Sequence, residues 1–459
     1  MIFINFCIII RNKYKINRRN SYEKYKKTRF CFTCCFIIGI LCLPLSASAA
    51  VVSYDITSPY DDIDWDSINQ YQAMLHAHTL YSDGTMDVKD VVETYYSLGY
   101  DILAITDHGV VNKGWNRVPD VLDLIGYNQY INKFEPMSQE RYEEITIEGA
   151  GRDGRPMLDV AYGIELNALV MRKNHINGFF VDYGNGILGE EEDYETVIAG
   201  NSAAGGITFI NHPGDFICAT RDESRARDYN QLKVFIDPLM KYDSCVGIEI
   251  FNLRDTVDRC DRILWDTILQ YTIPQGKNVW GFANDDSHEF EDIDVTRDIM
   301  LMPELSNEAL RTAMENGTFF ACSRYAHIEM GEDFVGEGAY ADIHEIIVDD
   351  NRDTISVVAS NYDTIEWIAD GEIIATGESI SLAEHSDEIG CYVRFQIKNK
   401  GGIVCSQPFV CDDGDMSDEA VEYPEEHVPN NIIAAFFQEL LSFLRRTLIG
   451  EIIYDEFFL

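Results

Sequence analysis

The sequence predicts an α/β protein in which a barrel of strand-helix repeats precedes a smaller all-β domain and a terminal amphipathic helix. Two observations carry this prediction. Between residues 72 and 323, short apolar runs alternate with helical stretches, a pattern typical of a parallel sheet with crossover helices. After Phe320, the helical pattern gives way to short alternating runs that are typical of antiparallel strands.

Seven apolar runs are the expected strands of the barrel, which we place at residues 70–325. They cover residues 72–76, 101–105, 157–164, 175–181, 207–210, 245–251 and 279–283. Between the first two, Val88, Val91, Val92 and Tyr95 recur at helical spacing, and Gly99 is placed to end that helix. Barrel enzymes carry their chemistry on loops after the strand C-termini. Polar residues beside these runs are therefore the first candidates for a functional site.

The second region predicts a small β-sandwich at residues 340–411. Its expected strands cover residues 345–348, 354–358, 364–368, 372–374 and 392–397. Asp370-Gly371 and residues 400–402 supply turn sequences between them. The combination of Asp387, Gly390 and Tyr392 is similar to the tyrosine corner of immunoglobulin-like domains. We therefore expect an immunoglobulin-like accessory domain without catalytic residues.

The chain closes with an acidic stretch and a second apolar pattern. Residues 412–430 are rich in Asp and Glu and are expected to form a solvated linker. Within residues 431–450, apolar side chains such as Phe436, Leu440 and Leu444 recur at helical spacing, which predicts an amphipathic helix. We expect that helix to contact a protein partner or a membrane surface.

The first 49 residues have the features of an export signal. A basic stretch from Arg11 to Arg29 precedes an apolar run from Phe30 to Leu45, and Ala47-Ser48-Ala49 then offers small residues for cleavage. We therefore expect residues 1–49 to be a signal peptide and the protein to be extracellular or associated with the cell surface. An uncleaved N-terminal anchor is the alternative.

Charge narrows the range of partners. The chain has a net charge of −42, and residues 50–459, with 27 basic and 77 acidic side chains, have a net charge of −50. Proteins that bind nucleic acid normally use Lys and Arg to neutralise phosphates. A DNA or RNA partner is therefore disfavoured, whereas 46% hydrophobic residues are enough to build folded cores.

Six of the ten histidines fall in short motifs beside the expected strands. The motifs are His76-Ala77-His78, Thr106-Asp107-His108, His175, Asn211-His212-Pro213 and Asp286-Ser287-His288, together with the carboxylate of Glu165. On an extended strand, side chains two residues apart point to the same side, so one metal can take both His76 and His78. The same spacing puts Asp286 and His288 on one side. A ligand set of nitrogen and oxygen without Cys suits Zn, Mn or Fe.

In this order, the motifs resemble those of the polymerase and histidinol phosphatase (PHP) family. The first motif continues from His78 to Asp83-Gly84, and the last begins at Asn284-Asp285. The resemblance implies a distorted seven-stranded TIM-like barrel with two or three divalent metal ions that hydrolyses phosphoesters. It also implies the ligands of each ion: His76, His78, Glu165 and Asp286 for the first; Glu165, His175 and His212 for the second; and Asp83, His108 and His288 for the third.

Further polar residues are candidates for catalysis or substrate binding. Asp107 directly precedes a proposed ligand, where it would orient an imidazole or assist proton transfer. Glu249 and Asn252 end an expected strand, and their Glu-x-x-Asn spacing is similar to a segment of the same family. We take Asp107 and Glu249 as catalytic candidates and Asn252 as a substrate-binding one.

For three other charged residues, the sequence allows more than one role. Arg221 and Arg254 lie on loops at the same end of the expected barrel, where paired donors would clamp a phosphate, although an exposed position would explain either equally. Asp285 should point away from Asp286 on an extended segment, as a solvated or capping residue.

These observations predict an exported metal-dependent phosphoesterase, either a phosphatase or a phosphodiesterase, that acts on a small-molecule phosphoester. Closely spaced metals would lower the pKa of a shared water, so a metal-bound hydroxide in a dinuclear or trinuclear site is the expected nucleophile. Because the same hydroxide attacks carbonyl carbon, a hydrolase of carbon-centred esters or amides is one alternative. A metal-bearing, non-catalytic binding or adhesion module is the other.

Overall fold

The computed structural model describes residues 53–119, 136–167, 174–186, 193–217, 223–255, 260–414 and 416. The chain divides into two units, residues 1–51 and 52–459, and every described residue belongs to the second. The predicted signal peptide (1–49), the predicted linker beyond Met416 and the predicted helix at 431–450 lie outside the described residues. Within the described part of the chain, no helix is both long and apolar enough to cross a membrane.

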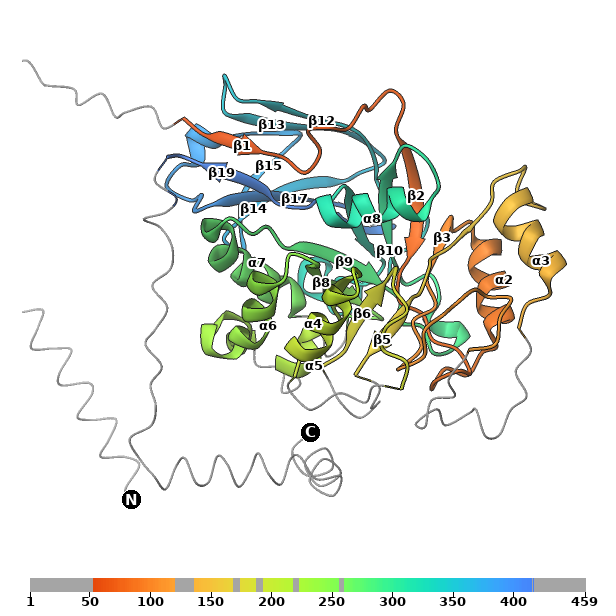
Figure 1. The fold of residues 1–459 in the computed structure, drawn as a ribbon. Coiled ribbons are helices and arrows are strands. Elements are labelled where there is room, and N and C mark those ends of the chain that lie inside the picture. Colours follow the sequence, from red (N-terminus) through yellow and green to blue (C-terminus); the bar gives the residue numbers. More distant parts are fainter. Residues whose placement is uncertain are drawn as a thin grey trace, which may run out of the picture. The chain divides into compact units, whose positions relative to one another are not determined.

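The expected barrel strands divide between two sheets (Figure 1). One sheet contains, in spatial order, β11 (Phe319–Ser323), β10 (Thr296–Met302), β2 (Asn69–Met74), β3 (Ile102–Leu103) and β4 (Leu158–Asp159). The other contains β5 (Ile164–Leu166), β6 (Ile176–Phe179), β7 (Ile207–Ile210), β8 (Cys245–Asn252) and β9 (Trp280–Asn284). Isolated parallel bridges join Ala77 to Ser287 and His108 to Glu165. In the described residues the strands are therefore linked by bridges between two sheets and do not form one closed parallel ring.

The prediction of parallel strands is wrong at β6, and β10 is an additional strand that was not predicted. β2, β3 and β4 run parallel, as do β7, β8 and β9, but β6 is antiparallel to both β5 and β7. The chain between Leu166 and Ile176 is shorter than the dozen or so residues that a parallel crossover needs. β10 is antiparallel to β2. The reversed β6 starts at the edge of the sheet where its neighbours end.

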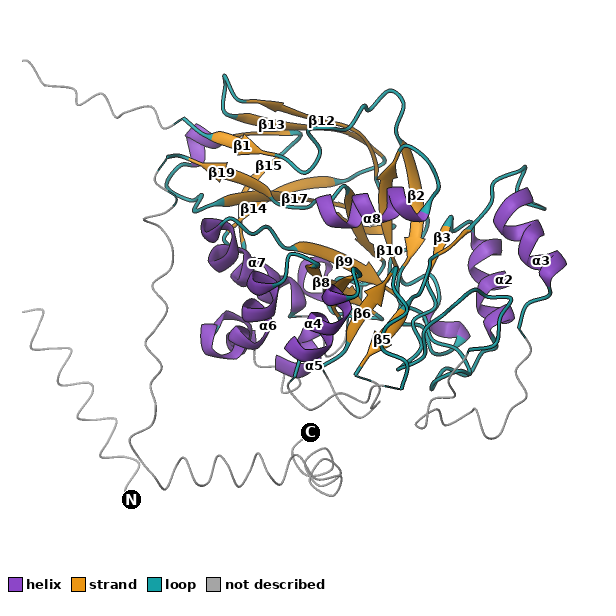
Figure 2. Ribbon diagram, viewed as in Figure 1, coloured by secondary structure: helices purple, strands orange, loops and turns teal. Residues whose placement is uncertain are grey.

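Helices flank the strands (Figure 2), and the helix that the periodicity predicts before Gly99 is present. α2 (Val88–Leu98) buries Val91, Val92 and Tyr95, and Gly99 ends it in the left-handed conformation with φ of +94°. The remaining helices of eight or more residues are α4 (Glu195–Ala203), α6 (Tyr229–Lys241), α7 (Asp261–Thr272) and α8 (Asn307–Asn316) in the described residues. Shorter ones are α3 (Gln139–Glu143), α5 (Pro213–Ile217) and α9 (His327–Met330).

The C-terminal region packs two antiparallel sheets face to face. β12 (Asp342–Asp349), β13 (Thr354–Ser360) and β16 (Ser379–Ser381) form one sheet. Facing it are β14 (Thr364–Ala369), β15 (Glu372–Thr376), β17 (Tyr392–Asn399), β18 (Gly402–Cys405), β19 (Phe409–Asp412) and β1 (Asp55–Thr57). A buried core that includes Ile355, Val357, Trp367 and Phe395 joins the two sheets. Asp370-Gly371, both at positive φ, turn the chain from β14 to β15 as predicted.

Two features of this region were not predicted from the sequence. β18 pairs with β11, so the sheet of the first region continues into the second. The hydroxyl of Tyr392 donates to Asp266 of α7 at 2.8 Å, whereas the hydroxyl of a tyrosine corner bonds to the backbone a few residues upstream. The prediction that Tyr392 forms a tyrosine corner is therefore wrong, and its side chain connects β17 to α7 through this hydrogen bond.

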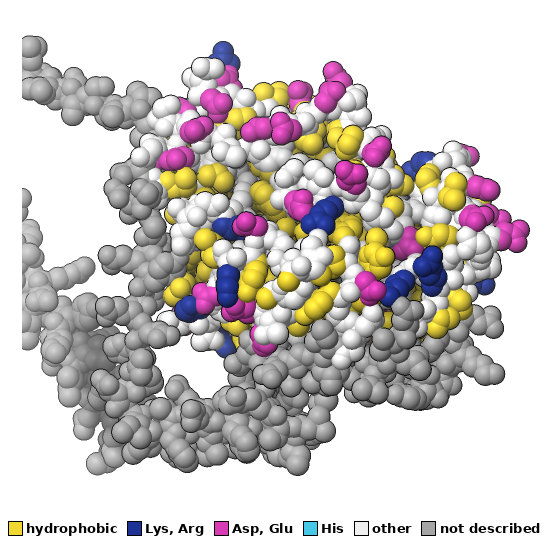
Figure 3. Space-filling view, viewed as in Figure 1, with side chains coloured by type: hydrophobic (Ala, Val, Ile, Leu, Met, Phe, Trp, Pro, Cys, Tyr) yellow, Lys and Arg dark blue, Asp and Glu magenta, His cyan; other side chains and the backbone are white. Residues whose placement is uncertain are grey.

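The surface keeps the acidic character of the composition. On the face drawn in Figure 3, Asp and Glu side chains are spread among apolar side chains, with Lys and Arg in small groups. The acidic side chains on this face agree with the net charge of the chain.

Candidate metal centre

The six predicted histidines meet at one edge of the two sheets. His76 and His78 follow β2, His212 follows β7 and His288 follows β9. His175 directly precedes β6, and because that strand is reversed it reaches the same edge. Among the predicted ligands, His175 starts its expected strand whereas the others end or follow theirs. The reversal explains this difference, since a residue that starts an antiparallel strand lies beside residues that end its neighbours.

The first group of side chains surrounds a single point. Nε2 of His76 and Nε2 of His78 lie 3.1 Å apart. Oδ1 of Asp286 lies 3.1 and 3.0 Å from these nitrogens, and Oε2 of Glu165 lies 3.4 and 3.1 Å from them. Tetrahedral ligands about 2.1 Å from a zinc ion are about 3.4 Å from one another. The spacing of the His76, His78 and Asp286 atoms thus fits one divalent ion, with Oε2 of Glu165 beside the two imidazoles.

Two oxygens of this group have no conventional partner. Oε2 of Glu165 and Oδ1 of Asp286 are buried and form no hydrogen bond of normal geometry, although imidazole nitrogens are close. A buried carboxylate oxygen without a donor is costly. A cation between the four side chains would satisfy both oxygens.

The second group lies on the other side of Glu165. Oε1 of Glu165 is 3.1 Å from Nδ1 of His175 and 3.6 Å from Nε2 of His212. Nδ1 of His108 is 3.0 Å from Oε2 of the same carboxylate. Asn211 holds the carboxylate in place by donating to Oε1 at 2.6 Å. The two oxygens of Glu165 therefore face neighbouring groups, which is the arrangement expected of a bridging carboxylate.

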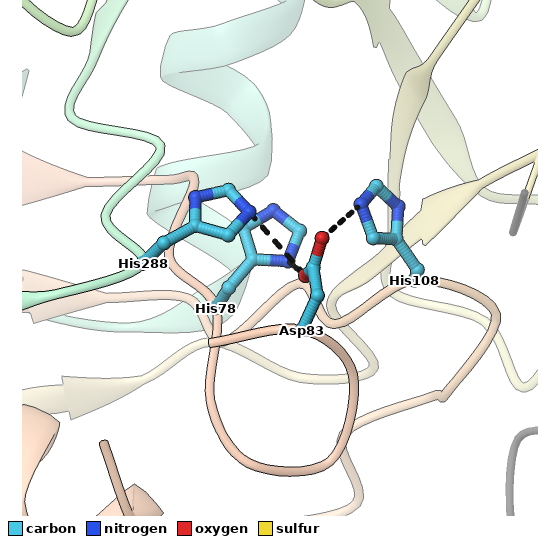
Figure 4. A group of neighbouring side chains, drawn as sticks. All are labelled: His78, Asp83, His108 and His288. Carbon is cyan, nitrogen blue, oxygen red and sulfur yellow. Dashed lines mark ion pairs between the residues drawn. The ribbon is translucent and has the colours of Figure 1, made fainter. Parts of the chain in front are cut away.

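The third group surrounds Asp83 (Figure 4). Its carboxylate lies 3.4 Å from Nδ1 of His78, 3.5 Å from Nε2 of His108 and 3.3 Å from Nε2 of His288. The side chains of Asp83 and His288 are 21% and 32% exposed, whereas those of the first group are almost fully buried. This group is therefore the side of the centre that a solute can reach, and His78 contributes to it as well as to the first group.

The loop that carries Asp83 is held by Asp107. The carboxylate of Asp107 accepts hydrogen bonds from the backbone N–H and hydroxyl of Thr79 and from the hydroxyl of Ser82, each at 2.7 Å. A Cβ on Gly84 would lie 2.8 Å from backbone atoms of residues 78 and 79, so only glycine fits there. The contacts of Asp107 support a positioning role, and its role in catalysis stays a prediction.

Glu249 lies behind His76. Its Oε1 accepts from Nδ1 of His76 at 2.8 Å and from Asn284 at 3.0 Å, and its Oε2 accepts from the N–H of His212 and from Asn252, each at 2.9 Å. Such a carboxylate fixes the tautomer and the ring orientation of an imidazole whose other nitrogen faces a metal. Glu249 and Asn252 are thus close to the centre, and their contacts favour support of the ligands over contact with substrate.

The structure tests the predictions for Arg254 and Asp285 and does not describe Arg221. Arg254 pairs with Asp292 at 2.8 Å, and Asp292 in turn accepts from the N–H of His288 at 3.1 Å, so Arg254 braces the loop of the third group. Arg221 lies outside the described residues. Asp285 points away from the centre, as its alternation with Asp286 predicts, and accepts from Tyr95 and from backbone N–H groups of residues 294–296. It is fully buried, so the alternative of a solvated residue is wrong.

Opposite charges shift the ionisation of the buried groups. Burial lowers the pKa of His76, but Asp286 and other nearby carboxylates outweigh this and raise it to about 10. Burial opposes charge on His108 too, yet Glu165 helps to raise its pKa to about 9. Burial would raise the pKa of Glu165, but the surrounding imidazoles hold it well below its usual range. Protons on imidazoles therefore balance the carboxylates, and a bound cation would replace those protons.

Backbone strain accompanies two of the clustered residues. His212 and Asp286 have φ of +27° and +46°, in the region that favours glycine. Non-glycine residues persist there only when their surroundings fix them, and such residues concentrate at functional sites. Sequence reasoning had not assigned roles to Asn211 and Asn284, although each belongs to a motif singled out at a strand end.

Comparison with known proteins agrees with the motifs. Residues 74–247 match the model of the PHP domain. No curated protein matches the chain. Among solved structures, a two-domain protein from Bacteroides vulgatus that contains a predicted PHP-like metal-dependent phosphoesterase is 15% identical, with 75% of this chain and 88% of that chain covered and a TM-score of 0.39.

Two further solved structures are similar over a shorter part of the chain. A putative metal-dependent phosphoesterase from Bifidobacterium adolescentis is 15% identical, covering 48% of this chain and 88% of that chain, with a TM-score of 0.27. An amidohydrolase from Chromobacterium violaceum is 15% identical, covering 48% of this chain and 89% of that chain, with a TM-score of 0.27.

Proposed function

We propose that this chain, whose residues 74–247 match the PHP domain model, is an exported metal-dependent hydrolase that cleaves a small-molecule phosphoester. The observation that carries the proposal is the first group, in which buried oxygens of Glu165 and Asp286 each lie 3.0–3.4 Å from the Nε2 atoms of His76 and His78 and have no hydrogen bond. The three groups of described residues that could hold a metal ion share His78 and His108. A multinuclear site follows from this sharing.

The proposed ligands follow the three groups. His76, His78, Glu165 and Asp286 would hold one ion. Glu165, His175 and His212, with Nδ1 of His108 beside them, would hold a second. Asp83, His108 and His288 would hold a third. The donors are nitrogen and oxygen only, which suits Zn, Mn or Fe.

Divalent ions in these positions would lower the pKa of bound water and neutralise charge on phosphoryl oxygens. The residues of the chain supply the rest. Glu249 orients His76, and Asp107 fixes the loop that presents Asp83. The exposure of Asp83 and His288 leaves one side of the centre open for a phosphoryl group. The acidic surface disfavours long polyanions, so the proposed substrate is small.

The test combines metal analysis with a substrate panel. The purified chain would be analysed for bound metals and then assayed on phosphomonoesters, phosphodiesters, carboxyl esters and amides, before and after chelation and metal restoration. We expect two or three metals per chain and phosphoester cleavage that returns with the metal. Cleavage of carboxyl esters or amides alone would favour the rival hydrolase. A metal-free, inactive chain would contradict the proposal.

Matched variants identify the site. His78→Ala and Glu165→Ala should each abolish hydrolysis and reduce bound metal, because Glu165 is a proposed ligand of two ions and His78 lies in two of the three clusters that could hold a metal ion. His344→Ala and Glu345→Ala on β12 are the controls, since both side chains are exposed there. Full activity in both site variants would refute the ligand assignment.

A further inference from the structure

A groove of about 510 Å³ lies at the opposite end of β9 from the metal centre. Trp280 lines the groove and begins β9, whereas Asp286 and His288 come after the end of that strand. The groove is also lined by the end of β1 and the residues after it, the connection between α7 and β9, the end of α8, and β19. None of its lining residues belongs to the three candidate metal groups. It is therefore a separate feature of the fold.

The floor of the groove is apolar. Trp280, Val410 and Met416 line it and are only partly buried, and Ile273 lies beneath them in the core. Val410 and Met416 pack against the core that includes α7, and Trp280 packs against the core beneath β2 and β10. The indole N–H of Trp280 donates to a backbone oxygen at the end of α8 at 3.0 Å, which holds the ring in place. Covering this floor with apolar side chains would remove apolar surface from water, which is favourable.

The rim of the groove is acidic. Asp61, Asp62 and Glu315 line it and are exposed, and no Lys or Arg is among the lining residues. Glu315 pairs with Arg311 at 2.8 Å, whereas Asp61 and Asp62 form no ion pair with another described residue. Partial burial and neighbouring carboxylates, Asp62 among them, raise the pKa of Asp61. A positive charge beside the rim would offset this repulsion, so the groove fits a partner that combines apolar side chains with basic ones.

The chain itself contains a segment with this chemistry. The predicted helix at 431–450 contains Arg445 and Arg446 against a single acidic residue, Glu439. The linker at 417–430 contains five acidic residues and no Lys or Arg, so the rim would repel the linker and attract the arginine pair. An apolar helix face of this extent requires a cover. The residues of that face are Ile433, Phe436, Phe437, Leu440, Leu441, Leu444 and Leu448.

The position of Met416 favours this segment over a separate partner. Met416 lines the groove and is the last described residue, so the linker at 417–430 starts at the groove. When fully extended, that linker spans at most about 50 Å. A short tether gives an effective concentration of about 1 mM. A helix that binds the groove with a Kd of only about 0.1 mM would then be bound in about nine molecules of ten.

We propose that residues 431–450 fold back onto this groove as an amphipathic helix. Its apolar face covers the floor of the groove, and its arginine pair lies beside Asp61 and Asp62. The docked helix covers the end of β9 that is farther from the metal centre, so it does not obstruct that centre. This proposal does not depend on the proposed phosphoesterase activity.

Hydrogen-exchange mass spectrometry of the full chain tests the docking. We expect slow exchange at residues 431–450 at protein concentrations where size-exclusion chromatography shows a monomer. Amides of a docked element exchange through its opening equilibrium, so Arg445→Glu with Arg446→Glu should accelerate this exchange about ten-fold. Leu440→Asp, which interrupts the apolar face, should accelerate it as well. Exchange in peptides that contain His78 or His108 should not change.

A charge swap is the decisive variant. Adding Asp61→Arg and Asp62→Arg to the helix with the reversed arginine pair should restore slow exchange, because both aspartates are exposed and only the charges trade places. Glu332→Arg with Asp333→Arg, an exposed acidic pair outside the groove, is the matched control and should not restore it. Fast exchange at 431–450 in the unaltered chain, or a swap that restores no protection, would refute the proposal.

Two other occupants of the apolar helix face give different results. Protection at 431–450 that disappears on dilution, together with a dimer in size-exclusion chromatography, would assign the helix to a second copy of the chain. Protection that appears only with vesicles of phosphatidylcholine and phosphatidylglycerol would assign it to a membrane surface. Either result would overturn the proposal.

Discussion

Glu249→Gln separates support of a metal ligand from direct catalysis. The carboxylate accepts four hydrogen bonds, two at each oxygen, from His76, Asn284, His212 and Asn252. A glutamine of the same shape keeps one acceptor oxygen and turns its NH2 group toward two donors on the other side. Two of the four bonds are therefore lost, whichever way the amide points.

The expected magnitude follows from that loss. Removing a group that orients a metal-binding imidazole typically costs about 10–100-fold in metal affinity or activity. We expect Glu249→Gln to weaken metal binding by that factor, equal to about 1.4–2.7 kcal/mol, and to retain substantial kcat at saturating metal. Glu345→Gln, on an exposed position of β12, controls for the change of charge.

The assay is competition for metal against a chromogenic chelator, followed by kcat at saturating metal. General acid or base catalysis typically contributes about 10²–10⁴-fold, so a direct catalytic role for Glu249 predicts a loss of kcat that added metal does not restore. Unchanged metal affinity with such a loss of kcat would refute the positioning argument. If neither quantity changes, Glu249 has neither role.

Three other predictions follow from the same contacts. Gly84→Ala should displace Asp83, because a Cβ at position 84 would lie 2.8 Å from backbone atoms of residues 78 and 79. Elemental analysis should then show fewer metals per chain, and an unchanged metal count would contradict this prediction. Arg394→Ala should lower the free energy of unfolding, measured by urea denaturation, by about 3–5 kcal/mol, since it leaves the buried Asp266 without its bidentate partner at 2.7 Å. A decrease below about 1 kcal/mol would show that the ion pair is not needed for stability. The metal-free chain should be less stable at pH 10 than at pH 6, because the folded state raises the pKa of His76 from 6.5 to about 10. The stabilisation from the protonated imidazole is complete below pH 6.5 and is lost as pH rises through about 10. Equal melting temperatures at the two pH values would contradict this prediction.

The sequence predicted local features well because they depend on neighbours in the chain. α2 ends at Gly99 as its periodicity requires, and β7 has the predicted bounds of Ile207–Ile210. The separation of Asp285 from Asp286 was predicted from the period of two along an extended segment, and it holds although Asp286 itself has φ of +46°. Each of these patterns is complete within a few residues, so no tertiary contact is needed to interpret it.

The arrangement of the strands was less accessible. β6 was expected to be parallel, and β10 and the pairing of β11 with β18 were not anticipated. Strand direction depends on the partner to which a strand bonds and on the length of the connection, and an apolar run contains neither. Tyr392 shows the same limit, because its hydroxyl bonds to Asp266, far away in the chain.

By itself, the sequence determined which side chains are candidates for a metal centre, since the spacing of His76 and His78 and the motifs around His108 and Asp286 offer nitrogen and oxygen donors. Only the tertiary structure decided how those donors are shared. It directed the two oxygens of Glu165 to neighbouring groups, brought His175 to the common edge by reversing β6, and set Glu249 behind His76. The physical reason is that the type and spacing of donors are local properties of the chain, whereas their distances depend on strands that pair across long stretches of sequence.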